Sequence, residues 1–426
     1  MRAITRRAAA NLLAAPLLAP GALAQGTALD LQRLVDEAAR AGRAAVIPPG
    51  LHVAANVRLS GTAHLVGAPG ARLFARAGAS ALVVTPGTSA RIEGVAIVGA
   101  PAALRDPPPL LAAEDAELAI EGCRLELAPG VALRLERCAG RVANTIVRRC
   151  GAGAIFALDS RGLALRDNVV EDAGANGIQV WRSQIGEDGT IVSGNRVARV
   201  RADPGGTGEY GNGVSIFRAG GVVVRGNVVR GTRFSGVRCN AGPNVVIEGN
   251  SLLDGRDTAL FVEFQSVGAV VTGNLIDGAG SGVQIVNFDV GGRLAVCANN
   301  LVRNLAILPH PETGKPSMGV GIQVEADANV TGNVIEGAPD TGIRLGWGFA
   351  LRDCLAAGNL VRECNIGISA SVAPEAGRAT IRGNVISGAR RAALAAMRWD
   401  EVASDDLQRD AARFPLLTVA ENRVHP

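Results

Sequence analysis

The segment Val224-Arg225-Gly226-Asn227-Val228-Val229 contains the repeated pattern from which the architecture follows. Its frame is an apolar residue, a variable one, Gly-Asn, a variable one and a second apolar one. The same frame recurs at 247–252, 271–276, 330–335 and 381–386, and looser copies centre on Asn144, Asn168, Asn195, Asn299, Asn359 and Asn422. The commonest spacing between these asparagines is 23 to 27 residues. Self-similarity at such a period is typical of a repeat architecture.

A second phrase, Gly-apolar-variable-apolar, follows each asparagine. Copies lie at 177–180, 213–216, 236–239 and 282–285, and others begin at Gly321, Gly342 and Gly367. Alternation with a period of two indicates short strands, and the glycines between them supply tight turns. One such unit cannot bury its apolar face alone, so the units must stack on one another.

These repeats predict an all-β fold, a single-stranded right-handed parallel β-helix. Successive coils pair in parallel about 4.8 Å apart, and right-handedness follows from the crossover rule for parallel strands. Aliphatic residues stack inside, and the asparagines stack as an amide ladder at one corner. The composition agrees, because 55 glycines and only 3% aromatic residues suit a narrow core of small side chains. Leucine-rich and helical solenoids fit less well, since the phrases are short and strictly alternating.

Both ends of the repeat carry helical patterns. Residues 28–42 predict a short helix with Asp30 as its N-cap, which would cover the open first coil. Residues 404–413 predict a second helical segment that interrupts the last coil. We therefore expect one β-helix domain over residues 25–426 with a capping helix at its start.

Residues 1–24 have the pattern of a cleavable export signal. Thr5-Arg6-Arg7 precedes an apolar run from Leu12 to Leu23, and Ala22-Leu23-Ala24 resembles a cleavage site. The paired arginines favour a twin-arginine signal and predict the twin-arginine export machinery as a partner. An ordinary secretory signal is the alternative. Either implies a periplasmic or secreted protein, and no later apolar run is long enough for a transmembrane segment.

Charge, cysteines and histidines exclude several functions. The formal net charge is +4, mostly from the N-terminal arginines, so the body offers no electrostatic footprint for nucleic acid. None of the seven cysteines forms a C-x-x-C motif, and we expect them to be small buried hydrophobic residues. The four histidines are scattered, so no metal site is predicted.

Two insertions interrupt the regular spacing between a ladder asparagine and the next glycine. One runs from Asn195 to Gly213 and the other from Asn299 to Gly321, so both should leave from the same corner. They lie four coils apart, or about 19 Å at sheet spacing, and could wall a groove. Solenoids also tolerate insertions that have no function. The loops carry Asp203, Glu209 and Tyr210, and then His310, Glu312 and Lys315.

The second phrase should point alternate residues outward, in columns that mix amide, arginine, carboxylate and aromatic side chains. Aromatic faces stack on sugar rings and polar groups bind hydroxyls or uronate carboxylates, so this face favours a sugar chain, with an ordinary solvated sheet face as the alternative. The residues predicted to contact a polysaccharide are Trp181, Glu209, Tyr210, Phe217, Asn240, Phe261, Gln284, Asn287, His310, Gln323, Glu325, Arg344 and Trp347.

Catalysis on a sugar would need a carboxylate pair, or a base beside a charge-neutralising group. Glu263 beside Arg238 on the adjacent coil is the strongest candidate, and Asp289 is a possible second carboxylate. Glu325 with Arg344 repeats the arrangement farther along. A glutamate beside an arginine is also a routine cross-strand pair, so the sequence leaves open whether the protein is an enzyme.

The opening helix, Pro48-Pro49-Gly50 and the Gly-Asn coils resemble the pectin-lyase-like β-helix superfamily over residues 28–426. Together with Thr5-Arg6-Arg7, the chain looks most like the twin-arginine-translocated repetitive proteins of proteobacteria. The resemblance implies a polysaccharide lyase, a glycoside hydrolase, a uronate epimerase or a non-enzymatic binder. It implies no cofactor beyond calcium in the case of a lyase. We expect binding or processing of polysaccharide in the bacterial cell envelope, with a non-catalytic periplasmic scaffold as the alternative.

Overall fold

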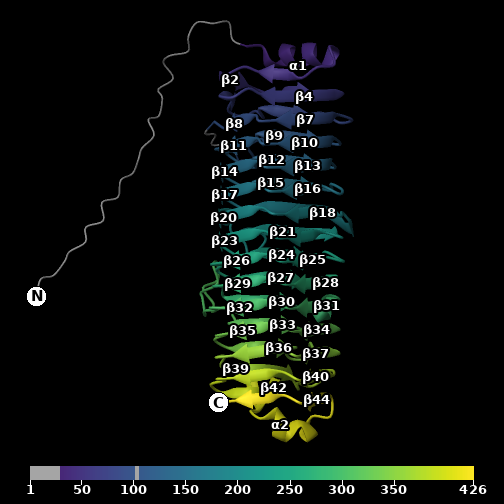
Figure 1. Cartoon of the computed structure of the whole chain (residues 1–426), viewed down its shortest axis with the longest axis vertical. Coiled ribbons are helices and arrows are strands. Elements are labelled where there is room, and N and C mark those ends of the chain that lie inside the picture. The colour runs from purple at the N-terminus through teal and green to yellow at the C-terminus, as the bar shows by residue number, and fades with distance from the viewer. Residues whose placement is uncertain (1–28, 101–104) are drawn as a thin grey trace, which may run out of the picture. The chain divides into compact units, whose positions relative to one another are not determined.

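The computed structural model describes residues 29–100 and 105–426, so the signal predicted at residues 1–24 lies outside the described residues. Leu31–Pro426 forms one compact unit. It is an all-β right-handed parallel solenoid of about 14 turns, and its coils stack in sequence order (Figure 1). The predicted fold class is confirmed.

Each coil contributes one strand to each of three sheets, which we call A, B and C in the order the chain visits them. Sheet A runs from β1 (Ala45–Ile47) to β44 (Leu417–Ala420), sheet B from β2 (Gly50–Ala54) to β45 (Arg423–His425), and sheet C from β3 (Val57–Leu59) to β43 (Glu401–Ser404). Neighbouring strands pair in parallel, with one antiparallel exception between β42 (Ala392–Arg398) and β43. This regular stacking brings residues about two dozen positions apart into contact.

The core is a set of columns of small aliphatic side chains. In sheet A, Leu165 pairs with Val192, Val192 with Val224, and Val224 with Ile247, and all four are fully buried. A narrow close-packed interior of this kind has little room for aromatic rings. The seven cysteines are free and buried, as expected, and burial raises the pKa of Cys297 to about 12.

A ladder of asparagines lies at the corner between sheets A and B. Asn227 Nδ2 donates to Asn250 Oδ1 at 2.9 Å, and Asn250 Nδ2 donates to Asn274 Oδ1 at 3.0 Å. Asn250 Nδ2 also donates to the carbonyl of Val224. The ladder consists of Asn168, Asn195, Asn227, Asn250, Asn274, Asn300, Asn333, Asn359, Asn384 and Asn422. These buried amides are satisfied by neighbouring coils, which fixes the register of the stack.

Two predicted ladder positions are wrong. Asn144 and Asn299 have φ angles of 51° and 56°, so they occupy the left-handed turn that glycine fills in other coils. The ladder bonds come from the next residue in each case. The backbone N–H of Thr145 donates to Asn168 Oδ1, and Asn300 accepts from Asn274 and donates to Asn333. Asparagine tolerates the left-handed region better than most residues, which makes an Asn in the glycine position easy to mistake for a ladder Asn.

The ends of the unit are covered by helical segments, as predicted. α1 (Leu31–Arg40) buries Leu31, Val35 and Ala38 against the first coil. α2 (Leu407–Asp410) and the 3-10 turn η2 (Ala411–Arg413) interrupt the last coil between β43 and β44. In the part of the chain that the structure describes, no helix has the length and apolar character needed to cross a bilayer.

Candidate functional site

The two insertions leave the solenoid at the same corner, as predicted. The 201–213 loop joins β20 (Arg196–Val200) to β21 (Val214–Gly220), and the 304–319 loop joins β32 (Leu301–Arg303) to β33 (Val320–Val324). In both cases the chain passes from sheet B to sheet C.

The 304–319 loop reaches back across the coils that separate the insertions. Arg233 Nη2 donates to the carbonyl of Pro311 at 2.9 Å, although the two residues are 78 positions apart. The rings of Phe234 and His310 meet edge to face with their centroids 5.4 Å apart. The two insertions therefore enclose the sheet B to sheet C corner of the intervening coils.

The predicted outward columns exist on sheet C. β18 (Ile178–Glu187), β21, β24 (Val237–Asn240) and β27 (Thr258–Glu263) pair in register. One row contains Gln179, Ser215, Arg238 and Phe261, and the next contains Trp181, Phe217, Asn240 and Glu263. The sequence-predicted residues of these four coils are thus neighbours on one face.

Aromatic residues gather on this side of the molecule. Of the 13 aromatic residues in the chain, nine lie in strands of sheet C or in the turns that follow them, and none of the nine is buried. They are Phe156, Trp181, Phe217, Phe261, Phe264, Phe288, Trp347, Phe349 and Trp399. The ring of Trp181 contacts Phe156 at 5.4 Å and Phe217 at 5.7 Å between centroids. The result is a partly exposed aromatic strip along the solenoid axis.

The Arg238–Glu263 pair lies beside this strip and is largely enclosed. Arg238 Nε donates to Glu263 Oε1 at 2.7 Å, and the side chains are 13% and 5% exposed. Asn240 Nδ2 donates to the same carboxylate oxygen. The backbone at Gly208 packs so closely against the Arg238 guanidinium that a side chain there would collide with it. The ion pair therefore packs against the 201–213 loop and lies beside the strip.

Asp257 is a member of this cluster that the sequence did not reveal. It is half-buried in the turn before β27, and burial raises the pKa of its carboxyl, although the nearby His310 and Arg238 charges lower it. Asp257 could have been singled out in the sequence by its position, because the turn before the Gly-apolar phrase holds an uncharged residue there in several other coils. Asp257, Arg238 and His310 come from three different segments.

The other predicted carboxylates lie elsewhere. Glu325 Oε2 accepts from the backbone N–H of Phe288 at 2.9 Å, and burial raises the pKa of Glu325. Arg344 pairs with Asp340, so the proposed repeat of the Glu–Arg arrangement at Glu325 and Arg344 is wrong. Each of the two side chains has another partner, since Arg344 is held by Asp340 and Glu325 by the backbone of Phe288.

Asp289 is exposed on the 3-10 turn η1 (Phe288–Val290), where its charge acts on Glu325. In the same turn Asn287 Oδ1 accepts from the backbone N–H of Phe264 at 3.0 Å. These two predicted residues therefore belong to the edge of sheet C rather than to the Arg238–Glu263 cluster.

Gln284, Gln323 and Tyr210 are wholly or partly covered, whereas Glu209 is exposed but bonded within its own loop. Gln284 and Gln323 are 5% and 3% exposed, and Gln284 Nε2 contacts Met318 Sδ of the 304–319 loop at 3.3 Å. Glu209 Oε2 accepts from the backbone N–H of Thr207. Tyr210 is half-buried in the same loop. Insertions that leave from the sheet corner fold over the nearest column, which sequence spacing alone does not show.

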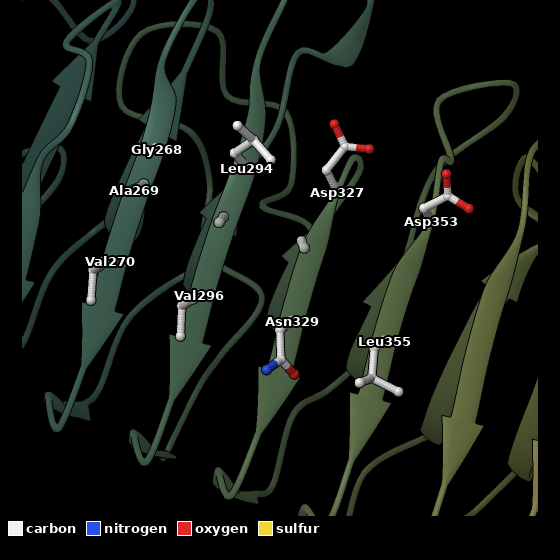
Figure 2. A pocket seen from close by; sticks show the side chains of 11 residues that line it. Gly268, Ala269, Val270, Leu294, Val296, Asp327, Asn329, Asp353 and Leu355 are labelled. Atoms are coloured by element: carbon white, nitrogen blue, oxygen red, sulfur yellow. The ribbon is translucent and has the colours of Figure 1, made fainter.

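A hollow of about 590 Å³ lies on sheet A, away from this face (Figure 2). Val270, Val296, Asn329 and Leu355 form one row across its four strands. The carboxylates at its rim are neutralised, since Asp327 pairs with Arg352 and Asp353 with Arg378. Within residues 29–100 and 105–426, no three His, Cys, Asp or Glu side chains gather into a metal-binding group.

The family model described as the right-handed beta helix region matches residues 130–304 and 184–366, which together cover more than half of the chain. The chain belongs to this right-handed β-helix family. The match is centred on the Gly-Asn coils. A search of the curated proteins gives no match to this β-helix protein.

Solved structures with the same fold are distant in sequence. The surface adhesin PfbA of Streptococcus pneumoniae is 13% identical, with 88% of this chain and 90% of that chain covered and a TM-score of 0.50. The catalytic domain of a GH87 alpha-1,3-glucanase in complex with tetrasaccharides is 14% identical, with 96% and 70% covered and a TM-score of 0.50. The pre-mature gene product 12 of bacteriophage phi29 is 12% identical, with 91% and 57% covered and a TM-score of 0.52. At these identities the likeness of the β-helix protein to each shows the fold alone.

Proposed function

We propose that this protein is exported to the bacterial cell envelope and binds a polysaccharide along the outer face of sheet C. The observation that carries the proposal is the gathering of nine of the chain's 13 aromatic residues, all at least partly exposed, on that face and its edge. The core has no need of these rings, because its columns are aliphatic.

The chemistry of the face supports a sugar chain. Partly exposed aromatic rings such as those of Trp181 and Phe217 are suited to stack on the apolar faces of sugar rings, with the edges of the aromatic rings still in contact with water. Next to them, Asn240 and the Arg238–Glu263 pair offer hydrogen-bond donors and acceptors for hydroxyl groups. The strip follows the solenoid axis, which suits a linear polymer. Arg6-Arg7 and the apolar segment after them support export.

The test is binding of purified protein to a panel of neutral and uronate oligosaccharides by isothermal titration calorimetry. Trp181→Ala and Phe217→Ala should each weaken binding by about tenfold, since buried aromatic contacts dominate interfaces. Phe74→Ala is a matched control, because Phe74 is a half-buried residue of β5 (Ala71–Ala75) on sheet B. Equal affinities for all three variants and the wild type, or binding of no oligosaccharide, would overturn the proposal.

A second candidate function, cleavage of the bound chain, rests on Asp257. A half-buried carboxyl whose pKa is raised by burial is suited to protonate the glycosidic oxygen as its bond to the anomeric carbon breaks, while a water molecule adds to that carbon. The test is release of reducing ends, together with the absorbance of unsaturated products, from the same polymers with and without calcium. Activity that Asp257→Asn abolishes, while binding persists, would support cleavage. Activity that this variant retains would exclude Asp257 as the acid.

A further inference from the structure

A cavity of about 570 Å³ lies at the sheet B to sheet C corner. Its lining comes from three consecutive coils and from both insertions, since the 201–213 loop contributes Asp203 and the 304–319 loop contributes Glu312. Its size falls within the range of about 300–1,000 Å³ that ligand pockets occupy. The cavity is therefore formed jointly by the two insertions and by the turns of the coils between them.

The charges in the cavity are partly neutralised by neighbours. Arg201 pairs with Asp203 at 2.7 Å, and Asp254 pairs with Arg230 at 2.8 Å. Arg233 donates one hydrogen bond to the carbonyl of Pro311.

Two further charged side chains in the cavity have no oppositely charged partner within the described residues. Arg256 and Glu312 are exposed, and neither side chain makes an ion pair or hydrogen bond within the described residues. Arg233 likewise takes part in no ion pair there. The cavity thus holds two arginines without a carboxylate partner and one carboxylate without a cation.

We propose that this cavity binds the carboxylate-bearing sugar residue of an acidic polysaccharide, with Arg256 and Arg233 on its carboxylate and Glu312 on its hydroxyls. The inference rests on the proposed function and adds the substrate class. An arginine guanidinium pairs with a carboxylate through two parallel hydrogen bonds, which gives orientation as well as energy.

The mixture of charges favours a sugar acid over a simple anion. Glu312, which has no cationic partner among the described residues, lies in the same cavity and would repel a multiply charged anion such as sulfate. A sugar acid presents one carboxylate to the arginines and several hydroxyl donors to the acidic side chains. The cavity thus has a partner for each group that such a residue carries.

The experiment compares oligogalacturonate with the same oligosaccharide after reduction of its carboxyl groups, by calorimetry on the purified protein. The wild type should bind the acidic form at least about tenfold more tightly, because hydrogen bonds between charged groups are the strongest ones available. Arg256→Gln should remove that preference, and Glu312→Gln should weaken binding of both forms. Arg72→Gln on β5, an exposed arginine of sheet B, is the control and should change neither affinity.

The outcomes separate this inference from the proposed function. If both forms bind equally and Trp181→Ala weakens both, the polysaccharide face stands and the acidic preference is wrong. If neither the acidic nor the reduced form of oligogalacturonate, oligomannuronate or oligoglucuronate binds, both proposals are wrong. Binding of inorganic phosphate as tight as that of oligogalacturonate would show a general anion site and overturn the inference.

Discussion

Arg238 and Glu263 form a largely enclosed ion pair, with Nε and Oε1 2.7 Å apart, against the Gly208 backbone of the 201–213 loop. The pair therefore links two adjacent coils and lies against one insertion. Removal of one partner leaves the other charge buried without compensation.

Glu263→Gln should destabilise the protein by roughly 3–5 kcal/mol, the usual cost of breaking a buried pair. Thermal unfolding and limited proteolysis within residues 201–213 would measure the effect. The control is Asp254→Asn, which breaks the Arg230–Asp254 pair, whose side chains are each 61% exposed. That change should cost less than about 1 kcal/mol. Similar losses for the two variants would contradict a special role for the enclosed pair.

Asn299 and Asn300 should respond oppositely to substitution. Asn300→Ala removes the bonds to Asn274 and Asn333 and leaves buried backbone groups unsatisfied, so a loss of about 2–4 kcal/mol is expected. Asn299→Gly should be neutral or stabilising, because φ at this position is 56° and glycine adopts that conformation without strain. Chemical denaturation gives the free energy of unfolding of both variants. Equal losses of this free energy would refute the assignment of Asn300, rather than Asn299, to the ladder.

Trp399 should matter only for long ligands. Its ring contacts Trp347 with centroids 4.6 Å apart, and both rings are exposed at the far end of sheet C. Six strand steps separate β18, which carries Trp181, from β36 (Thr341–Leu345), or about 29 Å at sheet spacing. Trp399→Ala should therefore weaken binding of long oligosaccharides and leave short ones unaffected. An equal effect at every chain length would mean that the strip is not continuous.

Asp257 should make the protein more stable at acidic pH than at neutral pH, relative to an uncharged variant. Burial raises the pKa of this carboxyl above its ordinary value of 3.8, so the folded state binds the proton more tightly than the unfolded state. Its contribution is fully present below that ordinary value and is lost as the pH rises through the raised pKa. Asp257→Asn should match the wild type in acid and exceed its melting temperature at neutral pH. A melting-temperature difference that does not change with pH would contradict this account.

The coil, its period and the alternation along each strand are predictable from the repeats alone. Gly-Asn and Gly-apolar phrases recur so often that Asn227, Asn250 and Asn274 had to stack, because no single coil buries its own apolar face. Trp181, Phe217, Asn240 and Glu263 followed in one row from the same alternation.

The surroundings of those residues cannot be predicted from the repeats. The 201–213 and 304–319 loops have no repeat, so nothing in their spacing shows that one packs on Arg238 and the other on Phe234. The same holds for Asp257, whose pKa is raised by burial and which is close to the charges of Arg238 and His310 from other segments. Local patterns fix the strands, because each strand's face is set within a few residues. Burial, charge pairing and the cavity at Arg256 depend on contacts between segments that only the folded stack brings together.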